Sequence, residues 1–280
     1  MVSDRHGRAV HDASLLDALT STVSAAAATI LAIGRDALAP RAKADRTPVT
    51  QADVAAETAI LEGLARALPG VPVVSEEALA GGEAPDLGTQ FFLVDPIDGT
   101  RELIDGRAEY AVNVALVVDG VPIIGVIAAP ALGLVWRGMV GHGAERLALA
   151  PGAGPQHARE RVAIRTRPFG GSGAVATVSR SHRDAATDAF LARLPVAKEI
   201  VCGSAIKFGR VAEGSADVYP RLAPTSDWDV AAGCALLAAA GGTVTTPHGA
   251  MLGLAGPKQG FRVPGFIAWG DQRAAAAFTG

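Results

Sequence analysis

The pattern of apolar and polar positions predicts helices and strands in both halves of the chain. An Ala-rich stretch flanked by leucines, residues 15–31, predicts a long first helix packed on the body of the protein. A second helix is predicted at residues 51–68, where Pro69 and Gly70 end it. Strands are predicted in the remainder of the first half at residues 71–75, 91–94, 111–118, 121–128 and 134–137.

The two halves differ in how these elements follow one another. Asp119-Gly120 is typical of a tight hairpin turn, so the first half is predicted to be α+β with a mainly antiparallel sheet. Residues 147–157 are rich in Ala, Gly and Pro and predict a loop, which divides the chain into residues 1–150 and 151–280. The second half indicates α/β layering, because strands (174–178, near Ile200, 217–219) alternate with helices (184–194, 206–213, 227–240).

Composition narrows the class of protein. The 280 residues are 49% hydrophobic and 19% charged, a globular balance, and the net charge of −3 provides no basic stripe for a polynucleotide. Cys202 and Cys234 lack paired or metal-type spacing, which fits small core residues in a reducing compartment. The apolar stretch 24–33 is too short to span a bilayer and lacks a basic flank, so we expect neither a signal peptide nor an integral membrane segment.

A predicted buried strand, residues 91–94, ends on two acids. Asp95 and Asp98 follow it directly, and open α/β sheets place their ligands at strand ends. The proline between the acids stiffens the turn and can direct the Ile97 carbonyl beside the carboxylates, as a further oxygen ligand for a hard cation. Gly99 lets the backbone approach whatever the metal holds.

Further residues at the edges of apolar runs extend this candidate site. Thr100 opens the next element with free N–H groups, which favour an anion. Glu76 follows the predicted strand at residues 71–74, and Asp229 lies in the opening turn of the predicted helix at 227–240. Asp53 lies in the first turn of another helix, where stabilisation of the helix dipole is an equally good explanation for it.

The predicted cluster consists of Glu76, Asp95, Asp98, Asp229 and the Ile97 carbonyl. Repulsion and desolvation would raise the pKa values of so many carboxylates unless a cation compensates them. An all-oxygen shell without His or thiolate favours Mg²⁺, with Mn²⁺ able to replace it, over Zn²⁺. Since there are more acids than one ion needs, two ions roughly 4 Å apart are expected, the usual arrangement for phosphoryl-group hydrolysis.

These residues, in this order and spacing, resemble the inositol monophosphatase superfamily of magnesium-dependent, lithium-sensitive phosphatases. Two boxes carry the resemblance, D-P-I-D-G-T at residues 95–100 and W-D-V-A-A-G at 228–233. More narrowly, five segments are similar to the bacterial 3′(2′),5′-bisphosphate nucleotidases: K-A-D-R-T-P-V-T-Q-A-D (43–53), S-E-E (75–77), D-G-T-R-E-L (98–103), S-R-S-H (179–182) and G-S-A-I-K-F (203–208). The likeness extends from residue 15 to about residue 270.

The resemblance implies a fold, an activity and a location. The fold would be a layered αβαβα sandwich, in agreement with the α/β elements predicted above. The activity would be removal of the 3′-phosphate from adenosine 3′,5′-bisphosphate to give AMP, a clearance step in sulfate assimilation, with the sulfated nucleotide as a second substrate. The protein would be cytoplasmic, and both peripheral attachment to the cytoplasmic face of the inner membrane and the choice between monomer and homodimer stay open.

The resemblance also implies residue roles. Glu76, Asp95 and the Ile97 carbonyl would hold one metal, and Asp95, Asp98 and Asp229 the other. Asp53 and Thr100 fall where the family keeps the pair that orients and deprotonates the attacking water, and Glu76 belongs to the same catalytic group. Lys207 and Arg221 would clamp the 5′-phosphate, with His182 beside the base. The substrate-binding set is Gly99, Thr100, His182, Ser204, Lys207, Arg221 and Asp229.

Two departures and two rival interpretations accompany the resemblance. Leu103 stands where near relatives usually carry an aromatic residue, and Asp105-Gly106 changes the loop that follows, so the shape of the pocket's rim and the range of substrates are in doubt.

One rival interpretation is the same hydrolysis with inositol monophosphate or fructose 1,6-bisphosphate as the substrate. The other is a nucleotide-binding module without catalysis, suggested by the glycine cluster at residues 170–173. That cluster lacks a Lys-Ser or Lys-Thr ending and precedes a strand.

Overall fold

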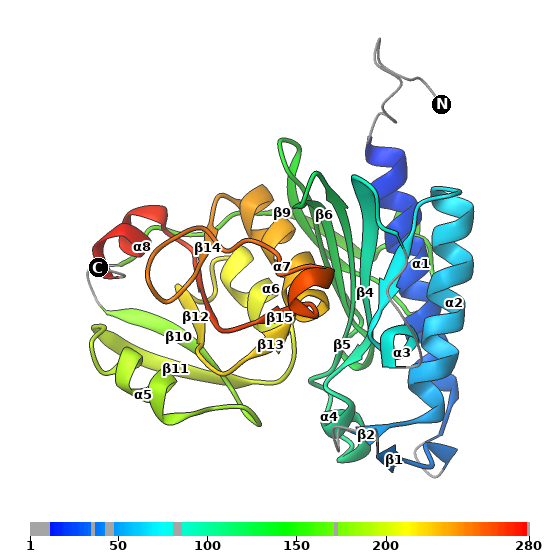
Figure 1. Cartoon of the computed structure of the whole chain (residues 1–280), viewed down its shortest axis with the longest axis horizontal. Helices are drawn as coiled ribbons and strands as arrows, with labels where there is room; N and C mark the ends of the chain where they lie inside the picture. The colour runs from blue at the N-terminus through cyan, green and yellow to red at the C-terminus, as the bar shows by residue number, and fades with distance from the viewer. Residues whose placement is uncertain (1–11, 35–36, 43–47, 81–85, 171–172, 279–280) are drawn as a thin grey trace.

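The computed structural model describes residues 12–34, 37–42, 48–80, 86–170 and 173–278. Residues 43–47 of the first nucleotidase-like segment and residues 171–172 of the glycine cluster lie outside these ranges. Two sheets run through the molecule, and helices lie between them and on both outer sides (Figure 1). Two of the candidate acids, Asp95 and Asp98, lie on a strand of the larger sheet, and the others lie on helices.

The larger sheet belongs mainly to the first half of the chain. Its order is β3-β4-β5-β6-β7-β8-β9, with β3 and β4 parallel and the other neighbours antiparallel. Helices α1 (Ala13–Ala32) and α2 (Gln51–Ala67) cover its outer face (Figure 1). The strands are β3 (Val73–Ser75), β4 (Gln90–Asp98), β5 (Ala111–Val118), β6 (Val121–Ala129), β7 (Leu134–Met139), β8 (Gly143–Ala148) and β9 (Glu160–Ile164).

Alternation along the central strands decides which side chains face which layer. Phe92 and Val94 of β4 pack in the apolar layer beneath α1 and α2, whereas Leu93 packs toward α7 (Asp227–Ala240). The inner face accepts α7 closely, because a Cβ at Gly125 of β6 would lie 2.1 Å from the carbonyl oxygen of Ala232. The two-residue period therefore puts the odd-numbered residues of β4, Asp95 among them, on the side of α7.

The smaller sheet has the order β11-β10-β12-β16-β14. Helix α6 (Ile206–Ala212) packs on its inner side together with α7, and α5 (Ala185–Leu191) and α8 (Gln272–Phe278) cover its outer side (Figure 1). The layers are thus α, β, α, β, α, and the predicted five-layer α/β sandwich is confirmed. The strands are β10 (Ala174–Ser179), β11 (Val196–Cys202), β12 (Val218–Arg221), β14 (Thr243–Thr245) and β16 (Phe266–Trp269).

Short elements connect the layers and border the site. They are β1 (Arg41–Ala42), β2 (Pro48–Val49), α3 (Glu76–Ala80), α4 (Thr100–Ile104), β13 (Thr225–Ser226) and β15 (Arg262–Val263), and the single-turn helices η2 (Pro130–Leu132), η3 (Pro155–His157) and η4 (Pro257–Gln259). The predicted hairpin turn is present, with positive φ at both Asp119 (50°) and Gly120 (78°). The predicted loop at residues 147–157 includes the end of β8, and the first sheet continues to Ile164, so the boundary near residue 150 stays a prediction.

One helix within the described part of the chain, α1, is long and apolar enough to cross a membrane by length and composition. More than half of its most apolar window, 56%, is buried against the rest of the protein. Leu19, Val23 and Ile30 pack into the apolar layer shared with α2. This packing is that of a core helix, as the sequence predicts.

Candidate active site

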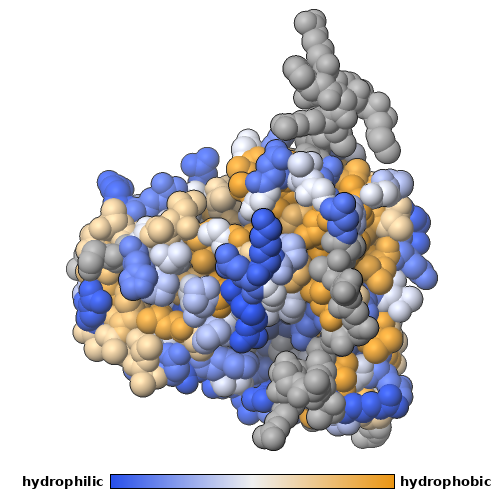
Figure 2. Space-filling view, viewed as in Figure 1, coloured by the Kyte–Doolittle hydropathy of each residue, from blue (hydrophilic) through white to orange (hydrophobic). Residues whose placement is uncertain are grey.

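A cavity of about 670 Å³ opens between the two halves of the molecule. Its lining comes from the end of β4, from α3 and α4 in the first half, and from α7, β13, β15 and η4 in the second. Strongly hydrophilic residues gather along the middle of the face that Figure 2 shows, over α7 and β15. The cavity lies at the junction of the two halves, where ligand sites are common, and both charged and apolar side chains line it.

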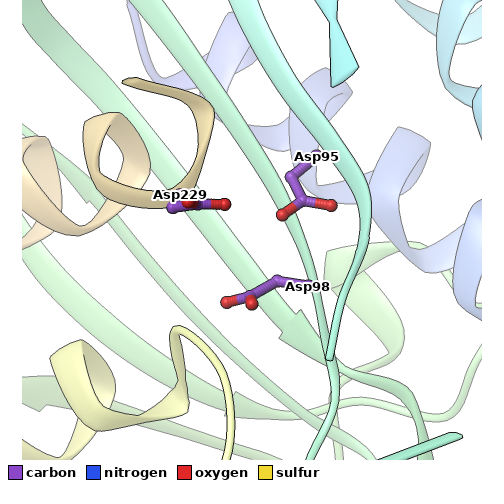
Figure 3. A group of neighbouring side chains, drawn as sticks. All are labelled: Asp95, Asp98 and Asp229. Carbon is purple, nitrogen blue, oxygen red and sulfur yellow. The ribbon is translucent and has the colours of Figure 1, made fainter. Parts of the chain in front are cut away.

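Three carboxylates converge on the floor of this cavity. Asp95 and Asp98 come from the exit of β4, and Asp229 faces them from the first turn of α7 (Figure 3). One oxygen from each lies within 4.8 Å of the others. Glu76, the first residue of α3, lines the same cavity beside this trio. The parallel pairing of β3 with β4 places both strand exits, and hence both sets of acids, at one edge of the sheet.

Crowding of these acids raises the pKa values of two of them, Asp95 and Asp98. Burial, followed by the charges of Glu76, Asp98 and Asp229, raises the pKa of Asp95 well above its ordinary value. Burial and the Asp229 carboxylate raise the pKa of Asp98 to about 6, although Lys207 and Arg221 act in the opposite direction. A cation bound among these oxygens would remove the repulsion and restore the ionised forms.

The backbone after Asp95 has the shape that the D-P-I-D-G-T box predicts. The Ile97 N–H donates to the Asp95 carboxylate at 3.0 Å, and the Ile97 carbonyl lines the cavity. Gly99 has φ +97°, and a Cβ there would lie 3.2 Å from a Glu102 carboxylate oxygen and 3.4 Å from the Glu109 carbonyl. Only glycine fits both the left-handed backbone and the close approach at this position.

Capping interactions hold two of the acids in fixed orientations. One Asp53 oxygen accepts the Thr50 N–H and hydroxyl, both at 2.7 Å, and its other oxygen lies 3.0 Å from the Thr100 hydroxyl. Asp229 caps its own helix in the same way, accepting the Ser226 N–H at 2.9 Å. Asp53 therefore caps its helix and also contacts Thr100, a residue that lines the cavity, whereas its role in catalysis stays a prediction.

The donor set fits a hard divalent cation. Only oxygen atoms are available as ligands here, from the three aspartates, from Glu76 and from the Ile97 carbonyl. Hard oxygen donors of this kind suit Mg²⁺ or Mn²⁺, and the raised pKa values of Asp95 and Asp98 indicate that Lys207 and Arg221 compensate the crowded acids only in part. The residues present therefore fit the cation that the sequence predicts.

The predicted substrate residues divide into two groups. Gly99, Thr100, His182, Arg221 and Asp229 line the cavity. Partial desolvation and the Arg221 charge lower the pKa of His182. The Nε of Arg221 is buried without a hydrogen-bond partner among the described residues, which leaves a donor for an anion.

Ser204 and Lys207, the second group, do not line the cavity. The Lys207 side chain is 1% exposed, and its ammonium donates to the carbonyls of Ser204 at 2.6 Å and Cys202 at 3.3 Å. The Ala205 N–H of the same turn donates to the Asp98 carboxylate. The turn therefore contacts the acid cluster through this hydrogen bond to Asp98 and does not line the cavity. Contact of Ser204 and Lys207 with substrate stays a prediction.

The sequence analysis missed several lining residues. Arg101 and Arg262 approach the cavity from α4 and β15, and among the described residues neither they nor Arg221 form an ion pair with a carboxylate, whereas Arg137 and Arg167 elsewhere do. Trp228 and Phe261 also line it, with ring centroids 6.0 Å apart.

Asp227, the first acid of S-D-W-D, has a structural role that the sequence did not reveal. Its carboxylate is fully buried and accepts the N–H groups of Ala255 at 2.9 Å and Gly256 at 2.7 Å. These bonds fasten the segment that leads to η4 and β15, and hence to Phe261 and Arg262. Because these N–H groups lie far from Asp227 along the chain, no local sequence pattern identifies the interaction.

The sandwich and its carboxylate-floored cavity define a phosphatase of the metal-dependent class. The chain belongs to the inositol monophosphatase family, whose family model matches residues 12–277. It is similar to the 3′(2′),5′-bisphosphate nucleotidase CysQ of Escherichia coli K12, with 41% identity over 225 residues, 80% of this chain and 86% of the relative.

Solved structures agree with this assignment. CysQ from Bacteroides thetaiotaomicron, a bacterial member of the inositol monophosphatase family, superposes with a TM-score of 0.73 at 32% identity, covering 91% of this chain and 96% of that one. Inositol monophosphatase from Anabaena gives a TM-score of 0.71 at 25% identity, covering 93% and 92%. The predicted family is therefore confirmed.

Proposed function

We propose that this chain is a Mg²⁺-dependent phosphomonoesterase that removes the 3′-phosphate of adenosine 3′,5′-bisphosphate, and of its sulfated form, to give AMP. One observation carries the proposal: a single cavity combines a floor of three carboxylates within 4.8 Å with three arginines that have no carboxylate partner among the described residues. The carboxylates can bind a cation, and guanidinium groups without a carboxylate partner can bind phosphates. This combination suits a substrate with more than one anionic group. The identity with bisphosphate nucleotidases supports the same choice.

Five residues supply the proposed cation ligands. Glu76, Asp95 and the Ile97 carbonyl would hold one ion, and Asp95, Asp98 and Asp229 the second. When bound, such ions offset charge on phosphate oxygens and make water easier to deprotonate. The chain contributes rigidity, because the Ile97 N–H and the Ser226 N–H orient Asp95 and Asp229 before substrate arrives.

Thr100 and Asp53 form the proposed proton path. The Thr100 hydroxyl lies 3.0 Å from an Asp53 oxygen and 3.2 Å from the Ile97 carbonyl. With its hydrogen directed to Asp53 and a cation on the Ile97 carbonyl, its lone pairs would accept a hydrogen bond from the attacking water. As the water attacks phosphorus, Thr100 takes its proton and passes its own to Asp53. The Thr50 N–H and hydroxyl hold the far Asp53 oxygen and keep the near one aimed at Thr100.

The remaining lining residues would select the substrate. Arg221, with Arg101 and Arg262 at the rim, would bind the second phosphate, and His182 would lie beside the base. A neutral His182 can donate or accept a hydrogen bond there. Lys207 is assigned an indirect part, through the turn that donates to Asp98.

The proposal also covers the location of the enzyme and the division of roles between the two halves of the chain. We place the enzyme in the cytoplasm, acting on a small-molecule nucleotide in sulfate assimilation. Both cysteines are free, which supports a reducing compartment. The first half of the chain would carry most of the acids and the second half the substrate-selecting residues with Asp229.

The test is substrate choice by the purified protein in Mg²⁺. Adenosine 3′,5′-bisphosphate, inositol 1-phosphate and fructose 1,6-bisphosphate are offered separately, and phosphate release is followed while the nucleotide product is identified by chromatography. We expect the bisphosphonucleotide to be hydrolysed fastest, with AMP as the product. Faster turnover of inositol phosphate would overturn the substrate proposal, and binding without any hydrolysis would favour a nucleotide-binding module.

A further inference from the structure

Asn113 is a buried polar residue in the middle of an apolar strand. Its side chain is 1% exposed, and neither its amide nitrogen nor its amide oxygen has a hydrogen-bond partner among the described residues. Its neighbours on β5, Val112 and Val114, pack beneath α1 and α2. Because successive residues of a strand point to opposite faces, the Asn113 amide faces α7 and the acid cluster.

The cross-strand register fixes which groups this amide can meet. On β6 the residue opposite Asn113 is Ile127, which is apolar. On β4 it is Asp95, and partners in register lie side by side on the same face with Cβ atoms about 5 Å apart. The next residues along β5 on this face, Ala111 and Ala115, carry no polar group. Of the two residues opposite Asn113 on the neighbouring strands, Asp95 is the one with a polar side chain.

The cost of this arrangement points to a missing partner. A buried amide group without a hydrogen bond costs roughly 1–3 kcal/mol, so a leucine would suit the strand better if stability alone mattered. One oxygen of Asp95 accepts the Ile97 N–H at 3.0 Å, and a carboxylate has further lone pairs that can accept a second donor. The unpaired amide of Asn113 therefore lies beside an acceptor in its own strand register.

We propose that Asn113 is a positioning residue for Asp95 in the cation-loaded protein. In that form the Asn113 amide nitrogen would donate a hydrogen bond to the Asp95 carboxylate beside it in the strand register. This bond orients the carboxylate and strengthens cation binding, as hydrogen bonds to ligating carboxylates do in metal sites. The inference rests on the cation part of the proposed function and is independent of the substrate.

The test compares Mg²⁺ binding to the whole chain and to Asn113→Leu, a change of similar volume that removes both polar atoms. Protein stripped with EDTA and dialysed is titrated with MgCl₂ alone in a calorimeter, and melting temperatures are recorded in EDTA and in Mg²⁺. We expect Asn113→Leu to bind Mg²⁺ about tenfold more weakly. Its melting temperature in EDTA should be equal to or above that of the wild type, since an unpaired amide is gone.

Val114→Ala is the matched control, because it changes the next residue of the same strand on the opposite face. It should lower the melting temperature through a cavity in the layer beneath α1 and α2, and leave the Mg²⁺ affinity unchanged. If Asn113→Leu does not fold, Asn113→Ala is measured in its place, with the same expected loss of affinity.

Unchanged Mg²⁺ affinity in the Asn113 variants would overturn the proposal and leave the amide as a partner of buried water alone. A wild-type protein that binds no Mg²⁺ would overturn it together with the cation part of the proposed function. If the wild type binds Mg²⁺ but does not hydrolyse the bisphosphonucleotide, only the substrate proposal fails. Weaker binding in the Asn113 variants then still supports the role of Asn113.

Discussion

The hydroxyl of Thr100 lies 3.0 Å from a carboxylate oxygen of Asp53, although the two residues belong to different helices. Thr100 starts α4 and lines the cavity, whereas Asp53 is 2% exposed and lies in the first turn of α2. The contact joins the outer helical layer to the acid cluster. It gives a group in the cavity a buried carboxylate to which a proton can be passed.

Replacement of Thr100 tests this contact. Thr100→Val keeps the shape but removes the hydroxyl, so kcat should fall by about 10²–10⁴-fold, the usual contribution of a positioned acid or base, while KM changes little. Thr100→Ser retains the hydroxyl and should keep most of the activity. Steady-state kinetics on both variants decides the matter, and a Val variant as active as the Ser variant would remove Thr100 from the proton path.

Asp95→Asn tests the acid cluster. The change removes a carboxylate placed against Glu76, Asp98 and Asp229, so turnover should fall by roughly 10³-fold or more. The melting temperature in EDTA should rise, because asparagine lacks the ionisable carboxyl whose desolvation and repulsion by neighbouring acids oppose the folded state. Asp188→Asn, which changes an exposed acid of α5 that pairs with Arg183, serves as the control and should leave turnover unchanged, with at most a small fall in melting temperature from the lost surface ion pair. Near-normal turnover in Asp95→Asn would contradict the assignment.

Much of this site could be predicted from sequence because its residues stand at boundaries between apolar and polar runs. An apolar strand that stops on Asp95 and a helix that starts just before Asp229 identify positions by local pattern alone. Convergence of these positions depends on the order of the strands in the sheet, which no local pattern contains. The family resemblance supplied that information.

The residues that were missed lack such a pattern. β8 and β9, at one edge of the large sheet, mix charged and apolar residues instead of forming apolar runs. Arg262 lies on a two-residue strand whose partner, β13, is distant in sequence. Asn113 was assigned only to a strand, because its significance depends on its register with Asp95.

The stability of the cation-free protein should depend on pH through Asp98. Its pKa in the folded protein is about 6, against an ordinary value of 3.8, so the folded state holds the proton more tightly than the unfolded state. Stability in EDTA should therefore decrease as pH rises from about 4 through about 6, and Asp95, whose pKa is also raised, should extend this decrease upward. Melting temperatures measured in EDTA across this range give the profile.

The same profile in excess Mg²⁺ is the control. Protons and cations compete for the carboxylates, so the stabilisation by Mg²⁺ should increase as pH rises through about 6. The difference between the two profiles should thus be small near pH 5 and large near pH 7.5. A melting temperature in EDTA that rises between about pH 4 and pH 6 would contradict the raised pKa values.

Arg262 should contribute to recognition of the second phosphate. Arg262→Ala removes one guanidinium from the rim, so KM for adenosine 3′,5′-bisphosphate should rise about tenfold, while KM for adenosine 3′-monophosphate should change little. Arg193→Ala, an exposed arginine that does not line the cavity, is the control. Equal increases in KM for both substrates would show that Arg262 does not contact the 5′-phosphate.

Lys207 should act on the site through the backbone turn that it holds. Its buried ammonium donates to the Ser204 and Cys202 carbonyls, lies 5.0 Å from the centre of the Tyr219 ring, and lowers the pKa of Asp98 by its charge. Lys207→Met keeps much of the volume but removes the ammonium donor from the Ser204 carbonyl and leaves the Cys202 carbonyl only the Arg180 N–H, which should lower the free energy of unfolding by roughly 1–3 kcal/mol.

Kinetics on two substrates separates this role from direct contact with phosphate. Movement of the turn would disturb Asp98, so Lys207→Met should lower kcat/KM by the same factor for adenosine 3′,5′-bisphosphate and for adenosine 3′-monophosphate. A KM that rises only for the bisphosphate would instead mean that Lys207 reaches the 5′-phosphate, as the family resemblance predicts. That outcome would require the turn to open when substrate binds, because the ammonium is 1% exposed in the free protein.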